Sequence, residues 1–244
     1  MVSMAEDPTN PKLRLVGGLQ HSPADKSQIF PLVGEAEFPG PPAMPHALVQ
    51  LELCLSASVV DLQDVTNIIR NDVGLTVQLL RVAAREAEVL PGKITPISEI
   101  VVQVGVDKLA ALAAQTKPVP DHLISACERF WTHSKLTALI AEELASQFPE
   151  LTLEEAYLAG LLCHLGDLSS ILGWATEGPQ ASRYIGYRMA KAWGFPALLT
   201  DLIGSYGEVG RTGKSHALLD IMEAADKAAS RLERQANRGV TCHE

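Results

Sequence analysis

Aromatic residues are scarce in this sequence: Phe, Trp and Tyr together make up 5% of its 244 residues, although 47% of the residues are hydrophobic. A core built mainly from Leu, Ala, Val and Ile favours close-packed helices, because β-sheets draw more on β-branched and aromatic side chains. The chain is also long enough to bury a substantial core. The composition therefore predicts a globular all-α protein and excludes a disordered one.

Positive charge and long apolar runs are also lacking. The chain has 20 Lys and Arg against 29 Asp and Glu, which gives a formal net charge of −9. This balance repels phosphate backbones and anionic lipids unless the basic residues cluster. No stretch approaches the roughly 18 apolar residues that cross a bilayer, and residues 1–7 do not resemble a secretion signal. We therefore expect a cytoplasmic protein with no nucleic-acid partner and no membrane attachment.

Paired cysteines and the common catalytic motifs are missing as well. The four cysteines contain no C-x-x-C pair, so their spacing indicates neither a disulfide framework nor a zinc knuckle. The sequence has no glycine-rich phosphate loop, no G-x-S-x-G elbow, no H-E-x-x-H motif and no EF-hand loop. These absences predict that the protein has no catalytic residues of a common class and no cofactor.

Prolines are concentrated at the start of the chain. Eight of the fifteen are Pro8, Pro11, Pro23, Pro31, Pro39, Pro41, Pro42 and Pro45. Each fixes φ and removes a backbone donor, so regular helix cannot persist there. We predict an irregular tail over residues 1–42, a helical domain over 43–236 with lobes at about 43–117 and 121–236, and a C-terminal tail over 237–244.

Helix signals recur after Pro45. Asp61 and Asp72 each precede an apolar stretch with helical period and are expected to cap it, and Thr152 with Glu155 forms a capping box. The last helix is predicted from about Ser215 to Leu232. Its basic residues either complement the helix dipole or offer a docking patch to an acidic partner. They are Lys227, Arg231, Arg234 and Arg238.

Three polar residues interrupt apolar helix faces. His133 and His164 lie within apolar stretches, and Asp226 falls on the inward face of the last predicted helix. A buried carboxylate is costly unless a cation, a donor or a metal accompanies it. His133 is the natural partner for Asp226.

Several motifs follow one another in a recognisable order. They are Ile69–Ala83 with the letters IRNDVGLTVQLLRVA, Ile97–Ile100 with Val104-Gly105, Phe130–Ser134 with the letters FWTHS, Ala156–Gly166, Gly186 with Trp193–Pro196, and Ala225-Asp226. Together they resemble the HDOD domain, a bacterial signalling relative of the HD phosphohydrolases, over about residues 38–235. The resemblance implies a two-lobed helical bundle whose C-terminal lobe is HD-like.

The metal-binding positions of the HD phosphohydrolases are altered in this chain. Those enzymes hold a metal with a histidine, an adjacent His-Asp pair and a distant aspartate, and the metal activates water. The resemblance places these positions at His133, Cys163, His164 and Asp226, so a thiol and an imidazole replace the His-Asp pair. We therefore predict that these positions are vestigial, that no metal is bound and that the protein is not an enzyme.

The chain differs from the family at two further places, outside the metal-binding positions. Many active relatives carry additional histidines in the region of Tyr206, where this chain has Gly204-Ser205-Tyr206-Gly207. The family commonly has an Asn-Ser pair after its Arg-x-Ala, where this chain has Ala84-Arg85. A function that depends on either feature is not expected here.

Two interpretations of the vestigial positions remain open. In the first, His133 and Asp226 form a buried hydrogen-bonded pair and Cys163 serves as a small apolar residue. In the second, His133, Asp226 and either Cys163 or His164 hold zinc. The first fits a non-catalytic signalling or regulatory module that contacts another signalling protein. The second fits a degenerate metal-dependent phosphohydrolase acting on a nucleotide or cyclic nucleotide.

Overall fold

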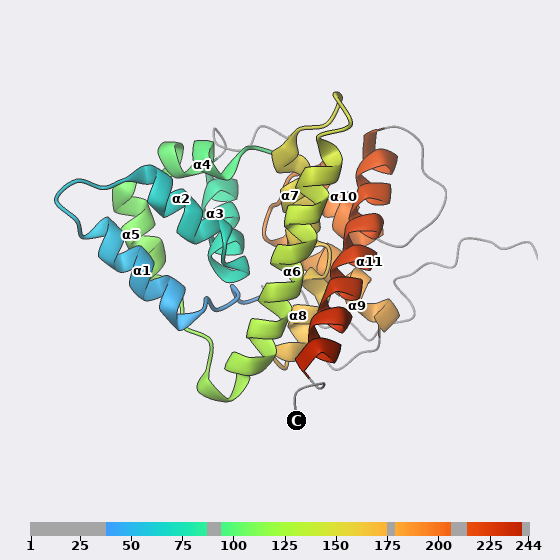
Figure 1. Ribbon diagram of the computed structural model, residues 1–244. Coiled ribbons are helices and arrows are strands. Elements are labelled where there is room, and N and C mark those ends of the chain that lie inside the picture. The colour runs from blue at the N-terminus through green and yellow to red at the C-terminus, as the bar shows by residue number, and fades with distance from the viewer. Residues whose placement is uncertain (1–37, 87–93, 175–178, 206–213, 241–244) are drawn as a thin grey trace, which may run out of the picture. The chain divides into compact units, whose positions relative to one another are not determined.

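The computed structural model describes residues 38–86, 94–174, 179–205 and 214–240 (Figure 1). All of them belong to one compact unit, residues 37–244. Within these ranges the secondary structure is helical, and the only β pairing is an isolated bridge between Ala43 and Pro118. The predicted all-α class is therefore confirmed. Residues 1–37 of the predicted tail and residues 241–244 lie outside the described part of the chain.

The first group of helices lies beside the second, and α3 is the member that faces α6 (Figure 1). Its members are α1 (Pro45–Leu55), α2 (Leu62–Arg70), α3 (Val73–Arg85), α4 (Ile97–Val104) and α5 (Val106–Gln115). α3 is apolar around much of its circumference, and Leu75, Leu79 and Leu80 are almost completely buried. A helix with this pattern must be covered on several sides, and α3 contacts α2, α4 and α5 of its own group and α6 of the second.

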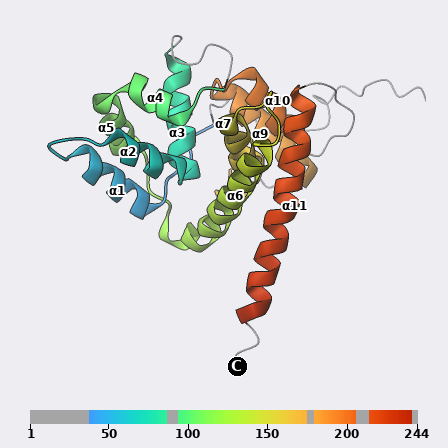
Figure 2. The same ribbon diagram turned by 45° about the horizontal axis from the view of Figure 1, so that its top comes forward.

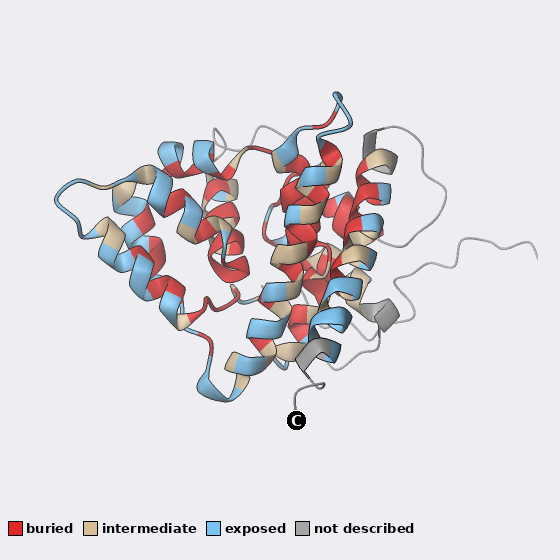
Figure 3. Cartoon of the chain, viewed as in Figure 1, coloured by how far each residue is buried: buried red, intermediate tan, exposed pale blue. Residues whose placement is uncertain are grey.

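The second group contains the longer helices. Its members are the 3-10 helix η2 (Asp121–Leu123), α6 (Ile124–Ala145), α7 (Leu153–Leu162), α8 (Leu165–Ile171), α9 (Pro179–Ala192), α10 (Ala197–Ser205) and α11 (Lys214–Val240). α6 lies beside α11 and α7 (Figures 1 and 2). Their shared core includes Ala141, Ala156, Leu202 and Met222. Figure 3 shows the buried residues on the facing sides of these helices.

The predicted caps are present. Asp61 Oδ1 accepts a hydrogen bond from the backbone amide of Gln63, and Thr152 and Glu155 form the reciprocal capping box. Asp72 Oδ1 accepts from the amide of Leu75 at 2.8 Å, while Oδ2 accepts from the amide of Met44 at 2.9 Å. Burial raises the pKa of Asp72, and these two amides partly oppose that effect. Asp72 therefore both starts α3 and ties the beginning of the domain to it.

Residues 38–42, which form the end of the predicted tail, contact helices of the domain. The indole Nε1 of Trp193 donates to the carbonyl of Phe38 at 3.0 Å, and Gln78 Nε2 donates to the carbonyl of Pro41 at 2.9 Å. Prolines prevent helix here, so the backbone carbonyls depend on side-chain donors from distant helices. We call residues 38–44 the leading segment.

The last helix is longer than predicted. α11 continues to Val240, beyond the expected end near Leu232 and into the predicted C-terminal tail. The residues between these points include Glu, Arg, Gln and Ala, which favour helix, and no proline interrupts them. No helix in the described ranges combines the length and apolarity needed to cross a membrane.

Candidate functional site

Three helical elements bring the predicted polar residues together. His133 lies in the middle of α6, His164 directly precedes α8, and Asp226 lies on α11. Gly160 lets α7 approach α6 closely, because a Cβ at this position would lie 2.9 Å from Cα of Ala138. This close approach carries His164, which follows α7, to the face of α6 that bears His133.

The two imidazoles share one carboxylate oxygen. Asp226 Oδ1 lies 3.0 Å from His133 Nε2 and 3.2 Å from His164 Nε2. The other ring nitrogens face carboxylates too: His133 Nδ1 lies 3.1 Å from Glu233 Oε2, and His164 Nδ1 lies 3.3 Å from Asp167 Oδ2. We call these five residues the carboxylate–imidazole cluster. All four imidazole nitrogens in it therefore have a carboxylate partner.

This arrangement favours protonated imidazoles. An ionised carboxylate only accepts hydrogen bonds, so a ring nitrogen facing one must donate. The hydrogen bond to Asp226 raises the pKa of His133, although burial and the neighbouring His164 oppose the change. Burial lowers the pKa of His164, but the Cys163 sulfur, Asp167 and Asp226 outweigh it and the net shift is upward. Both shifts favour the charged form of the imidazole.

Asp167 is the charged partner at one end of the cluster. Burial acts to raise its pKa, but the hydrogen bonds from His164 and Ser182 prevail and the net shift is downward. The hydroxyl of Ser182, on α9, donates to Asp167 Oδ1 at 2.5 Å. The cluster therefore extends from α11 through α6 and α8 to α9.

Protonation of the cluster predicts a pH-dependent stability. Both histidine pKa values are raised above the ordinary 6.5, so the folded state binds protons more tightly than the unfolded state. The resulting stabilisation is complete below pH 6.5 and is lost as the pH rises through the folded-state values. We expect the Tm to fall from about pH 6 to about pH 9, as measured by circular dichroism at constant ionic strength.

The control for this pH dependence is a pair of variants. A His133→Asn, His164→Asn double variant should lose most of the decline, whereas His122→Asn, which replaces an exposed histidine in η2, should retain it. Parallel Tm profiles for the native protein and the double variant would contradict the assignment of charge to these two histidines.

The sequence predicts part of this site. The His133–Asp226 pair is present, but the side chain of Asp226 is 21% exposed and so is less buried than expected. Glu233 and Asp167 were not predicted to take part. Helical spacing offers a signal for both, because Glu233 lies two turns after Asp226 and Asp167 lies three residues after His164.

Cys163 lies next to the cluster and its sulfur acts on His164, but its own hydrogen bond goes elsewhere. Its side chain is buried, and Sγ donates to the carbonyl of Gly160 at 3.1 Å. This is the position of a small apolar residue with a weak donor. Among the described residues, the groups that could hold a cation are therefore His133, His164 and Asp226, whose candidate ligand atoms lie within 4.8 Å of one another.

The donor set of these three residues suits one cation. Two imidazole nitrogens and a carboxylate oxygen are common zinc ligands, and Glu233 and Asp167 could orient the rings from behind. Binding would require both Nε2 atoms to lose their protons, so the cation must compete with the hydrogen bonds described above. The resemblance places His164 where the HD phosphohydrolases have the aspartate of the His-Asp pair, and an imidazole nitrogen cannot bridge two cations as a carboxylate can.

Comparison with known proteins identifies the family. A model of the HDOD domain matches residues 42–181, which is more than half of the chain. The fold is similar to the MmoQ response regulator from Methylococcus capsulatus str. Bath, with a TM-score of 0.64 and 16% identity over 82% of this chain and 89% of that chain. It is also similar to a virulence factor from Campylobacter jejuni subsp. jejuni, with a TM-score of 0.55 and 17% identity over 81% of this chain and 87% of that one. None of the curated proteins matches the chain in sequence. The chain belongs to the HDOD domain family.

Proposed function

We propose that this HDOD protein is a non-catalytic signal-transduction module that acts through contacts with another signalling protein in the cytoplasm. The observation that carries the proposal is that every imidazole nitrogen of the cluster faces a carboxylate. Hydrolysis of the HD type requires a cation that activates water at this position. Protons shared between the imidazoles and these acids supply no such nucleophile, and the cluster then joins α6 and α11 to His164 at the start of α8.

The end of α11 supports the part of the proposal that concerns protein contacts. Figure 2 shows its last turns extending beyond the neighbouring end of α6. Leu232 on α11 is 48% exposed, and Arg231 and Arg234 on the same helix are also exposed. An apolar side chain flanked by guanidinium groups suits an acidic partner with an apolar contact of its own.

The second candidate function is a degenerate metal-dependent phosphohydrolase acting on a nucleotide or cyclic nucleotide. The proximity of His133, His164 and Asp226 favours it, because three ligands leave a coordination position free for water. The two candidates differ in whether a cation or protons occupy this cluster.

Metal content and turnover distinguish the candidates. We expect the purified full-length chain to contain no more Mn, Fe or Zn than a His133→Ala, Asp226→Ala double variant, as measured by mass spectrometry of the metals. With each metal added, hydrolysis of bis(p-nitrophenyl) phosphate and of cyclic nucleotides should equal that of the variant. The proposal of a non-catalytic module would be overturned if the native chain contained stoichiometric metal and hydrolysed these substrates, and if both properties disappeared in the double variant.

A second arm of this test addresses the contacts. The native chain should retain a partner from cytosol that an Arg231→Glu, Arg234→Glu variant loses. Arg129→Glu, which reverses an exposed charge on α6, should still retain it. Equal retention by both variants would show that the end of α11 is not the contact surface.

A further inference from the structure

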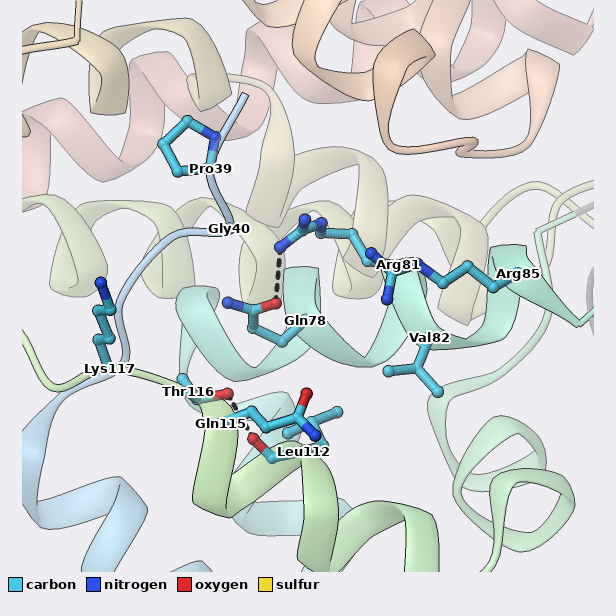
Figure 4. A pocket seen from close by; sticks show the side chains of 10 residues that line it. All are labelled: Pro39, Gly40, Gln78, Arg81, Val82, Arg85, Leu112, Gln115, Thr116 and Lys117. Carbon is cyan, nitrogen blue, oxygen red and sulfur yellow. Dashed lines mark hydrogen bonds between the residues drawn. The ribbon is translucent and has the colours of Figure 1, made fainter. Parts of the chain in front are cut away.

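A pocket outside the carboxylate–imidazole cluster is lined by basic residues. It has a volume of about 270 Å³ and lies between α3, the end of α5 and Pro39-Gly40 of the leading segment (Figure 4). Arg81, Arg85 and Lys117 line it, and no acidic residue is found among its described lining residues. In a chain with a formal net charge of −9, such a local excess of positive charge favours an anion. The volume is near the lower end for small-molecule sites.

The two arginines are arranged around the same space. Arg81 and Arg85 are four residues apart on α3, so they lie on the same helix face and repel each other. Figure 4 shows both side chains running back along α3 toward Gln78. Arg81 Nη1 donates to Gln78 Oε1 at 2.8 Å, which orients its guanidinium group. An anion bound between the two would relieve their repulsion.

Two of the three cations, Arg85 and Lys117, have no acidic partner among the residues that the structure describes. The acidic residue next to Arg85 is Glu86, and it pairs with Lys108. Both unpaired cations are exposed, so they are accessible to a ligand from solvent.

The leading segment completes the wall of the pocket. A Cβ at Gly40 would overlap the guanidinium group of Arg81 and the amide of Gln78, so glycine lets the backbone lie directly against them. Gln78 also donates to the carbonyl of Pro41, which holds the segment in place. The pocket is therefore built from parts of the sequence that are far apart.

An adjoining pocket offers a different surface. It has a volume of about 240 Å³, shares Arg81 and Arg85 with the first pocket, and is lined by the aromatic residues Phe38 and Trp193. The Arg81 guanidinium lies over the Trp193 ring, 5.5 Å from its centroid. A ligand could therefore place a charged group among the cations and an organic group beside the rings.

We propose that these two pockets bind a small phosphate ester that carries an aromatic group. Guanidinium groups bind phosphate through paired hydrogen bonds. Three cations also match the charge of a phosphate dianion better than they match the single charge of a carboxylate. The phosphate lies among Arg81, Arg85 and Lys117, and the organic group lies against Phe38 and Trp193. This inference goes beyond the regulatory role proposed above, because it gives the domain a chemical input at a site separate from the carboxylate–imidazole cluster.

Calorimetric titration of the full-length chain tests the proposal, with inorganic phosphate, phenyl phosphate and acetate as probes at constant ionic strength. We expect saturable binding of both phosphates, with phenyl phosphate tighter and acetate at least about tenfold weaker than inorganic phosphate. An Arg85→Gln, Lys117→Gln double variant should bind both phosphates at least about tenfold more weakly. Arg81 is left in place because it packs on Trp193.

A second double variant serves as the matched control. Arg129→Gln, Lys227→Gln removes two exposed cations from α6 and α11, and its affinities should equal those of the native chain. Circular dichroism should show unchanged Tm values for both double variants. Three results would overturn the proposed anion site. They are the failure of either phosphate to bind, an equal loss of phosphate affinity in both double variants, and acetate binding as tight as phosphate binding. Phenyl phosphate no tighter than inorganic phosphate would overturn the aromatic part of the ligand.

Discussion

Replacement of Gly166 by alanine is expected to destabilise the protein by about 3 kcal/mol or more. Gly166 lies in α8, where a Cβ would overlap the backbone carbonyl of Ser182 on α9. A backbone group cannot rotate away as the end of a side chain can, so the two helices must separate. In an ordinary helix interior the same substitution would stabilise by about 1 kcal/mol. The sign of the effect is therefore diagnostic of the close approach.

Urea denaturation monitored by circular dichroism measures this effect. Ser170→Ala is the matched control, because it changes an exposed residue of the same helix and should alter stability by no more than about 0.5 kcal/mol. Separation of α8 from α9 would also break the hydrogen bond between Ser182 and Asp167. The Gly166→Ala variant should therefore show a weaker decline of Tm with pH than the native chain. A more stable variant would show that α8 and α9 do not meet at this glycine.

The second large effect is expected at Arg70, the last residue of α2. Its Nη2 lies 2.5 Å from Glu142 Oε1 on α6 and 3.8 Å from Glu154 Oε2 on α7. Its guanidinium carbon lies 3.7 Å from the centroid of the Tyr157 ring, and the Tyr157 hydroxyl donates to the carbonyl of Arg70 at 2.7 Å. One residue of the first helix group thus engages three residues of the second.

Arg70→Gln should lower the free energy of unfolding by about 2 to 3 kcal/mol. This is less than for a fully buried pair, because the side chains of Arg70 and Glu142 are 27% and 25% exposed. Burial raises the pKa of Glu154, while the amide of Ile97 and Arg70 oppose it. Without Arg70 this pKa rises further, so the loss of stability should grow as the pH increases above about 5.

Urea titrations at about pH 5 and about pH 7.5 test this pH dependence. Lys108→Gln provides the comparison, because Lys108 also pairs with a glutamate, Glu86, but its side chain is 54% exposed. That variant should lose no more than about 1 kcal/mol. If Arg70→Gln and Lys108→Gln lower the free energy of unfolding by the same amount at both pH values, Arg70 is an ordinary surface residue and does not join the two helix groups.

Local signals in the sequence account for most of the helices. Asp72 could be predicted as a helix cap, because an aspartate that precedes a helix accepts a hydrogen bond from a backbone amide two or three residues further along the chain. Gly105 separates α4 from α5 with a φ of 79°, a conformation that suits glycine. The end of α11 was missed because charged residues with high helix propensity carry no stop signal.

The candidate site could be predicted only in part. The inward faces of two helices suggested that His133 meets Asp226, and the resemblance located Cys163 and His164 where the metal-binding pair would stand. The orientation of Cys163 toward the carbonyl of Gly160 could not be predicted, because it depends on the turn between α7 and α8.

The sequence by itself determined the helical class and the caps, since these depend on residue type and on neighbours within a few positions, and its resemblance to the HDOD domain implied that Cys163 and His164 replace the His-Asp pair. Tertiary structure decided that Glu233 meets His133 and that the leading segment meets α3 beside Arg81. The physical reason is distance: helix hydrogen bonds form between residues four apart, whereas these contacts join atoms that only the packing of several helices brings within about 3 Å.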